Sequence, residues 1–182
     1  APRVSLRAAT EHLPVLDALE RPVDDGDPLH RVPTWSAQQH FWMRATPEGA
    51  TAFDNLTCPS CAFATDDRAA VQCARCEAWL PRPCKRMRGP PDSYRPVRAF
   101  RTSYRRMVGD RPSRTLTTNS GVISSDVKGH PTQHRVLSVR EVLIVSSLSA
   151  FPGCVDAIRR LAPAAETLER VATLKQIRHI AG

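Results

Sequence analysis

Two Cys-x-x-Cys pairs limit how this chain can fold more than any other feature of its sequence. Cys58 and Cys61 form the first pair, and Cys73 and Cys76 form the second, with eleven residues between the pairs. Each pair presents two thiolates from one tight turn, and two such turns close a tetrahedral shell of four sulfurs that suits zinc. Such a shell leaves no open coordination position, so the sequence predicts a structural zinc ion. Free thiols or a disulfide pair are the alternative.

The composition predicts a chain with much loop and a modest core. Its 182 residues include 16 prolines and only 5% aromatic residues, although 41% are hydrophobic. Prolines in such numbers interrupt helices and strands, and this length fits one ordinary domain or a small core with satellite modules. We therefore expect an α+β fold: an irregular small domain with short β-strands, a four-cysteine zinc-ribbon-like module and C-terminal helices.

The sequence shows no sign of a membrane segment or of secretion. No apolar run approaches the roughly 20 residues that span a bilayer, and residues 1–13 lack the apolar core of a signal peptide. Paired cysteines at this spacing are typical of metal sites in a reducing compartment. We expect a soluble intracellular protein without a membrane partner.

Positive charge is concentrated in the second half of the chain. The net charge is +8, yet residues 1–81 carry seven basic against eleven acidic residues, and residues 82–182 carry nineteen against seven. Between Arg82 and Arg114, ten arginines and one lysine face only two aspartates and alternate with aromatic residues. Such a density of one sign favours contact with a nucleic-acid backbone; a merely solvated surface is the alternative.

Local patterns predict several elements. Residues 1–20 are typical of a loop with a short helical piece, and the Pro- and Arg-rich run over 80–107 is too polar for a buried element. The β-prone residues 115–118 and 121–125 favour a short hairpin or paired strands. Ser138 and Glu141 fit a capping box, which predicts a helix from about Val139 to about Leu148. Further helices are expected over 155–161 and 165–180, after a break at 151–153.

Cys84 lies apart from the two pairs, between Arg82 and Lys85. Neighbouring cations lower the pKa of a thiol, and a nucleophilic cysteine needs a lowered pKa. No acidic residue or histidine is close in sequence, so we expect an ordinary surface thiol. Catalysis by Cys84 and replacement of a zinc ligand stay open as alternatives.

From Arg101 onward, the order of residues resembles that of one protein family. A Pro-x-x-Thr-Leu-Thr-Thr stretch precedes His-Pro, an arginine and a Ser-x-Arg-Glu helix start. The same order ends the target-recognition domain and opens the ninth motif of DNA cytosine-5 methyltransferases. The positions that carry the resemblance are Pro112, Thr115, Leu116, Thr117, Thr118, His130, Pro131, Arg135, Ser138, Arg140 and Glu141.

Two weaker similarities flank this stretch. The segment around His30 and Pro47-Glu48-Gly49 is similar to the lead-in of the family's recognition domain, and residues 175–182 resemble the opening of its tenth motif. The resemblance thus implies a lead-in over 1–50, a zinc-stapled, Arg-rich target-recognition domain over 51–135, and a helical segment over 136–182.

The resemblance implies duplex DNA binding and target-sequence recognition, as in restriction–modification. In this family a thiolate attacks C6 of a flipped cytosine, and C5 receives the methyl group of S-adenosylmethionine. The sequence contains none of the family's Phe-x-Gly-x-Gly, Pro-Cys-Gln, Glu-Asn-Val or Gln-x-Arg-x-Arg motifs. We therefore expect a fragment or subunit that is inactive alone, with S-adenosylmethionine bound only by a catalytic methyltransferase half, in the nucleoid-associated cytoplasm of a bacterium or phage host.

The same resemblance assigns roles to individual residues. The basic groups would meet phosphates or guanine edges, and the threonines would bond the DNA backbone or bases. The expected DNA-binding residues are Arg82, Lys85, Arg86, Arg101, Tyr104, Arg105, Arg106, Arg111, Arg114, Thr115, Thr117 and Thr118. The expected structural residues are His130, Arg135, Ser138, Arg140 and Glu141, of which Arg135, Arg140 and Glu141 would hold the recognition loops onto the helix.

Two other functions remain open. A zinc-ribbon nucleic-acid-binding module of transcription or RNA metabolism explains the cysteines and the arginines, but it does not explain the order of the residues after Arg101. A catalytic fragment that uses Cys84 is the third hypothesis.

Overall fold

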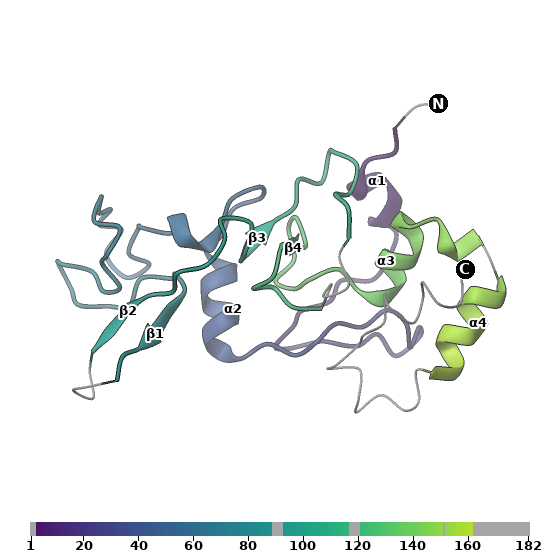
Figure 1. Cartoon of the computed structure of the whole chain (residues 1–182), viewed down its shortest axis with the longest axis horizontal. Coiled ribbons are helices and arrows are strands. Elements are labelled where there is room, and N and C mark those ends of the chain that lie inside the picture. Colours follow the sequence, from purple (N-terminus) through teal and green to yellow (C-terminus); the bar gives the residue numbers. More distant parts are fainter. Residues whose placement is uncertain (1–2, 89–92, 117–120, 151, 162–182) are drawn as a thin grey trace.

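Short helices and still shorter strands, joined by long loops, make up the chain (Figure 1). The computed structural model describes residues 3–88, 93–116, 121–150 and 152–161. Four α-helices, two 3₁₀ helices and four strands lie in these residues, and this confirms the predicted small α+β fold. They are α1 (Leu6–Thr10), α2 (Ala37–Arg44), η1 (Ala52–Asp54), β1 (Cys84–Arg86), β2 (Tyr94–Pro96), β3 (Arg105–Arg106), β4 (Val127–Gly129), α3 (Val139–Val145), η2 (Leu148–Ala150) and α4 (Pro152–Leu161).

Serine side chains cap the starts of α1, α2 and α3. Ser138 accepts a hydrogen bond from the Glu141 N–H, and the Glu141 carboxylate accepts one from the Ser138 N–H, so the predicted capping box is confirmed. Ser36 and Gln39 form a second capping box at the start of α2. Helix α3 ends at Val145, before the predicted Leu148, because Ser147 has a φ of 59° and leaves the right-handed helical region.

The C-terminal part differs from the prediction in one respect. The prediction places a break at 151–153 and a helix from Val155, but α4 begins at Pro152. Proline fits the first turn of a helix because the N–H it lacks has no partner there. The helix predicted over 165–180 lies outside the described residues.

Two separate two-stranded sheets form, and neither is the predicted hairpin. Strands β1 and β2 pair antiparallel, and β3 pairs in parallel with β4. Residues 111–116 and 121–126 contain no strand, while 117–120 lie outside the description. The β-prone Ile123 instead packs into the core, where its carbonyl accepts a hydrogen bond from Tyr104 N–H. Tertiary packing therefore overrides local strand propensity here.

Gly129 allows the close approach of β4 to β3. A Cβ atom at Gly129 would lie 2.9 Å from the Arg105 carbonyl oxygen, which is closer than side chains come to backbone. Glycine is the residue that permits such backbone proximity without a side-chain clash.

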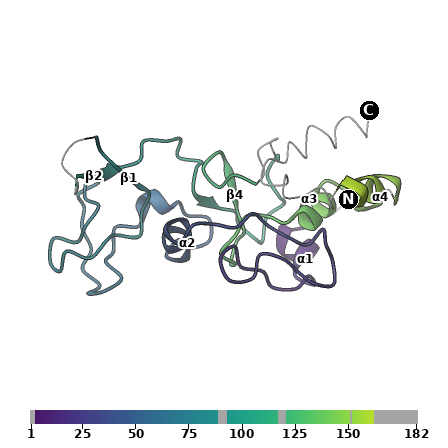
Figure 2. The same cartoon turned by 90° about the horizontal axis from the view of Figure 1, so that it is seen from below.

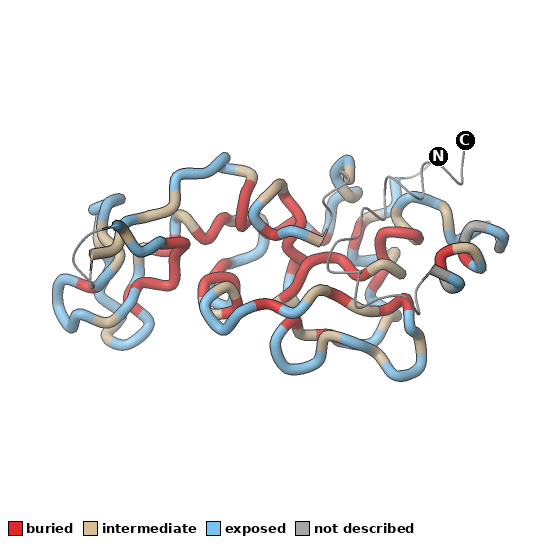
Figure 3. Tube along the Cα trace, turned by 60° about the horizontal axis from the view of Figure 1, so that its bottom comes forward, coloured by how far each residue is buried: buried red, intermediate tan, exposed pale blue. Residues whose placement is uncertain are grey.

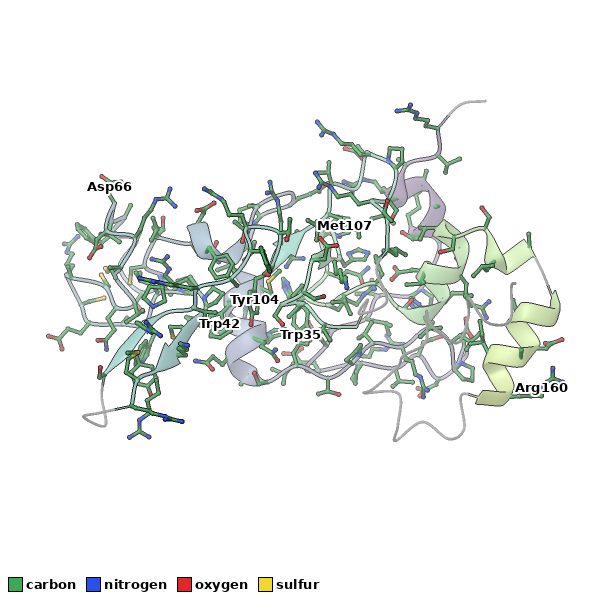
Figure 4. All side chains as sticks on the ribbon, in the orientation of Figure 1. Trp35, Trp42, Asp66, Tyr104, Met107 and Arg160 are labelled. Atoms are coloured by element: carbon green, nitrogen blue, oxygen red, sulfur yellow. The ribbon has the colours of Figure 1, made fainter. Side chains whose placement is uncertain are left out.

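The largest hydrophobic cluster occupies the middle of the molecule, where buried segments converge (Figure 3). Trp35, Trp42 and Tyr104 lie there (Figure 4), and the Trp42 and Tyr104 rings meet edge to face at 5.6 Å. Cys84 and Tyr104 belong to this cluster, so the expectation that the run over 80–107 contains no buried element is wrong. The partners that bury Cys84 and Tyr104 come together only in the folded chain.

The molecule is elongated, with the cysteine segment and the helices α1, α3 and α4 at opposite ends (Figures 1 and 2). Asp66, between the two cysteine pairs, and Arg160, in α4, mark these ends in Figure 4. Strands β1 and β2 lie at the end that carries the cysteines.

Candidate metal centre and the basic surface beside it

The four paired cysteines converge on one point. Their sulfur atoms all lie within 4.8 Å of one another, and the Sγ atoms of Cys58 and Cys76 are 3.5 Å apart, while those of Cys61 and Cys73 are 3.6 Å apart. Each short distance joins a cysteine of the first pair to one of the second. The cluster can therefore hold a metal ion between the two loops, as the spacing predicts.

The two Cys-x-x-Cys loops have the same backbone geometry. The residue after each second cysteine, Ala62 or Glu77, donates its N–H to the carbonyl of the first cysteine of its pair, over 3.0 and 2.9 Å. Both residues have positive φ, at 56° and 60°, a region that costs a non-glycine residue about 1–2 kcal/mol. The same strained turn appears twice because each loop must present two sulfurs on one side.

The thiols also oppose one another's ionisation. Burial would raise the pKa of Cys58, but backbone N–H groups of Cys61 and Ser60 lower it to about 6. The backbone N–H of Ala78 acts to lower the pKa of Cys76, yet the neighbouring thiols of Cys61 and Cys58 raise it to about 12. Four sulfurs this close can all be thiolates only beside a cation, which is what a bound metal ion supplies.

Little apolar packing supports the cysteine segment. Its own cluster contains Cys58, Cys73 and Leu80, with small partly buried residues beside them. Two buried polar side chains connect the segment to its surroundings. Arg82 donates from Nη1 to the Ala70 carbonyl at 3.0 Å, and Asn55 donates from Nδ2 to the Pro81 carbonyl at 2.7 Å. The segment is thus held by cysteines and hydrogen bonds more than by a core.

Arg82 and Arg106 are buried, and this contradicts the expectation that they contact DNA. Arg82 is 4% exposed and uses its guanidinium for the bond to Ala70. Arg106 is 3% exposed. Its guanidinium donates to five acceptors: the carbonyls of Met43, Thr46, His130 and Gln133, and His134 Nδ1.

Arg106 therefore holds loops together. Met43 and Thr46 lie at the C-terminal end of α2, where carbonyl groups without helical partners favour a cation. Burial lowers the pKa of Arg106 to about 10, so the side chain stays charged at neutral pH. The acceptors come from two segments far apart in sequence, and the guanidinium fork joins them.

Tyr104 and Arg105 also differ from the expected DNA contacts. Tyr104 is 9% exposed and packs in the central cluster. Arg105 is half-buried, and its Nε donates to the Gly49 carbonyl at 2.9 Å. Tyr104 is thus a core residue, and Arg105 uses its Nε for a backbone carbonyl of the same chain.

The remaining basic candidates are at the surface. Arg101 lies 3.6 Å from an Asp54 carboxylate oxygen, which partly neutralises it. Thr117 and Thr118 lie outside the described residues. Six of the expected DNA-binding residues are exposed, five of them basic: Lys85, Arg86, Arg101, Arg111, Arg114 and Thr115.

Sequence reasoning did not single out Arg95, although it is exposed on β2 directly opposite Lys85. Tyr94, which also lies on β2, contacts Trp79 near the second cysteine pair, with ring centres 4.8 Å apart. Strands of three residues are too short for a clear alternating pattern, so the only available signal was the position of Arg95 in the basic run.

Cys84 is buried, contrary to the expected surface thiol. Its side chain belongs to the central cluster and lies 3.9 Å from Gln38 Nε2. Burial raises the pKa of this thiol, although Arg82 acts in the opposite direction. Cys84 is therefore held as a protonated core residue, which argues against the hypothesis of a nucleophile.

Four of the five expected structural residues lie in one buried network around the start of α3: His130, Arg135, Ser138 and Glu141. Arg135 and Glu141 make a bidentate ion pair, with Nη1–Oε2 at 2.5 Å and Nη2–Oε1 at 2.8 Å. Burial acts to raise the pKa of Glu141, but Arg135 outweighs it and the pKa is lowered. On the surface side of α3, Arg140 pairs with Asp27 over 2.5 and 2.9 Å and so ties the loop before His30 to the helix.

Two histidines complete this network. The fully buried His30 places Nδ1 2.9 Å from Ser138 Oγ and Nε2 2.7 Å from the Pro14 carbonyl. A carbonyl only accepts, so His30 donates there and its Nδ1 can accept the Ser138 hydroxyl. His130 Nδ1 accepts from the N–H groups of Thr132 and Gln133, and burial together with Arg135 lowers the pKa of His130 to about 3.

In the part of the chain that the structure describes, no helix combines the length and the apolar character needed to cross a membrane. Comparison of the chain with models of known protein families, with curated proteins and with solved structures found no match.

Proposed function

We propose that this chain is a zinc-stabilised module that binds duplex DNA and supplies target recognition for a DNA cytosine-5 methyltransferase. Methyl transfer from S-adenosylmethionine to cytosine C5 would belong to a catalytic half, in another part of a longer polypeptide or in a partner subunit. The module would work in the cytoplasm, on the DNA of a bacterium or phage.

One observation carries this proposal. His30, Arg135, Ser138 and Glu141, which were singled out by their order in the sequence, lie in one buried network although up to 111 positions separate them. A good helix cap alone needs only Ser138 and Glu141. His30 connects the lead-in to the start of α3, and Arg135 connects the central segment to it. We expect such a junction in a recognition domain whose loops are fixed on a helix.

The geometry of the cysteines supports zinc as the metal. With Zn–S bonds of about 2.3 Å, a tetrahedral shell places its sulfurs about 3.8 Å apart. The Cys58–Cys76 and Cys61–Cys73 sulfur distances, 3.5 and 3.6 Å, are close to this spacing. Four thiolates favour zinc over hard cations such as magnesium or calcium, which prefer oxygen.

The chemistry of the described residues supports a binding role. Cys84 is a protonated core thiol, and a four-sulfur zinc shell has no open position for water or substrate. The exposed basic residues beside the cysteine segment provide charge complementary to phosphate.

A binding experiment separates this proposal from its main rival, a zinc-ribbon module of transcription or RNA metabolism. The zinc-loaded chain is titrated with a pool of duplex DNA of randomised centre and with single-stranded RNA of the same composition, at two salt concentrations. We expect tighter binding to the duplex by about tenfold or more. Tighter binding to the RNA would favour the rival.

A second assay tests whether the chain alone transfers methyl groups. The chain alone, incubated with labelled S-adenosylmethionine and duplex DNA, should transfer no methyl group. Turnover would show that the catalytic groups are present in this chain and would overturn the proposal.

A further inference from the structure

Strands β1 and β2 form an antiparallel pair, called the ribbon here, that carries exposed basic residues. We infer that the ribbon enters the major groove of duplex DNA, with Lys85 and Arg95 as the pair of side chains that meet it. This inference rests on the proposed function and adds to it the element that contacts the bases, including a residue, Arg95, that sequence reasoning did not assign.

The ribbon is longer than its strands. Within it Cys84 faces Pro96, Lys85 faces Arg95 and Arg86 faces Tyr94. Hydrogen bonds from Val97 N–H to the Pro83 carbonyl at 2.9 Å and from Met87 N–H to the Ser93 carbonyl at 2.8 Å continue the pairing at both ends. Residues 83–87 and 93–97 thus form one regular two-stranded unit.

The central pair of the ribbon carries two like charges. Lys85 and Arg95 are directly opposite and both exposed, and side chains in such a pair lie close enough for like charges to repel. No acidic side chain in the described ranges forms an ion pair with either residue. A pair of this kind destabilises a free ribbon, and an anion placed against it removes the repulsion.

The opposite side of the ribbon is anchored. Cys84 is buried in the central cluster, and Tyr94 packs against that cluster and against Trp79, whose ring plane is inclined by 73° to it. Trp79 follows the second cysteine pair by three positions. The core and the cysteine segment therefore both support this one face of the ribbon, and the backbone that carries the charged pair is fixed before any partner arrives.

A two-stranded ribbon fits the major groove of DNA. A major groove about 12 Å wide admits a two-stranded ribbon as it stands, whereas a minor groove about 6 Å wide admits one only when the duplex is deformed. Lysine and arginine are the side chains that bond guanine O6 and N7, which are exposed in the major groove. The ribbon presents one of each at the same level, so adjacent guanines or a guanine and a phosphate are within its reach.

The test compares two variants that lose the same charge. The double substitution Lys85→Gln/Arg95→Gln removes the ribbon pair, and Arg3→Gln/Arg160→Gln removes two exposed charges from the opposite end of the molecule. The full zinc-loaded chains are titrated with the duplex pool over a range of salt. The guanines of a bound duplex selected from the pool are then probed with dimethyl sulfate, which methylates N7 in the major groove.

We expect the ribbon variant to bind about tenfold or more weakly than the control variant. We also expect the unmodified chain and the control variant to protect guanine N7, and the ribbon variant to lose that protection. Equal affinity of the two variants, or protection that persists without Lys85 and Arg95, would overturn the inference and leave the proposed function standing. Absence of duplex binding by the unmodified chain would overturn both.

Discussion

Arg135 and Glu141 form an ion pair in the interior, where each side chain is 1% exposed. The same carboxylate accepts the Ser138 N–H at 2.7 Å and so also caps α3. An ion pair without solvent has a large desolvation cost, which only complete pairing offsets. Because Glu141 serves both the arginine and the helix, this one side chain connects the central segment to the C-terminal helices.

Glu141→Gln is therefore expected to destabilise the fold strongly. The amide retains the size of the carboxylate but leaves the Arg135 charge buried without a counter-ion, a change that costs about 3–5 kcal/mol. The free energy of unfolding in urea measures it. Glu20→Gln, at an exposed position, is the matched control and should change that energy by less than about 0.5 kcal/mol. A loss no larger than that of the control would contradict the network described for α3.

Acid should destabilise the protein through His130. In the folded chain the pKa of His130 is about 3, against 6.5 for an ordinary histidine. Below pH 6.5 the unfolded chain therefore binds a proton that the folded chain does not bind. Stability is complete above pH 6.5 and falls as the pH is lowered toward 3, by about 1.4 kcal/mol per pH unit from this group.

His130→Asn isolates that contribution, because the asparagine oxygen can accept the two N–H groups that His130 Nδ1 accepts. Urea unfolding at pH 6.5 and at pH 5 should show a decrease that is smaller in the variant by about 1.6 kcal/mol. The same decrease in both proteins would mean that His130 titrates normally in the folded chain.

How far the sequence predicts this structure depends on the distance between interacting residues. The capping box of α3 and the cysteine loops were predictable because their partners lie within four positions. Arg106 was not, since its acceptors at Met43, Thr46 and His130 come together only in the folded chain. An arginine in a basic run is usually at the surface, and nothing local marks the one that is buried.

The same limit explains Ile123 and Cys84. The residues near Ile123 have strand propensity, but Ile123 packs with Tyr104 in the central cluster, and its carbonyl accepts the Tyr104 N–H. Cys84 has cationic neighbours in sequence, yet the ribbon turns its side chain into the core. Charge along a chain predicts which segment meets solvent, and the alternation of a strand decides which side chain does.

Arg106→Met should weaken the fold and spare the DNA contact. The methionine leaves the buried carbonyls of Thr46 and His130 without a donor, and each unpaired group costs about 1–3 kcal/mol. Urea unfolding should show a loss of about 3 kcal/mol or more. At a temperature where the variant is folded, its affinity for duplex DNA should match that of the unmodified chain. An affinity loss comparable to that of Lys85→Gln/Arg95→Gln, without a change in stability, would place Arg106 at the interface.

Cys76→Ala is expected to abolish the metal site. Cys76 is the exposed member of the cluster, so the change creates little cavity, but a tetrahedral shell with three sulfurs binds zinc far more weakly. Metal content after extensive dialysis should fall well below one ion per chain. Cys84→Ala is the matched control, because Cys84 is outside the cluster, and it should keep the metal. Loss of metal from both variants, or from neither, would show that the four sulfurs are not the ligands.

The most direct test of the account is the zinc content of the purified chain, measured together with its thermal unfolding in the presence and absence of a strong chelator. The account predicts one zinc ion per chain, a lower melting temperature after chelation, and loss of duplex binding as the brace behind the ribbon is released. A chain that contains no zinc and melts at the same temperature in chelator would contradict it.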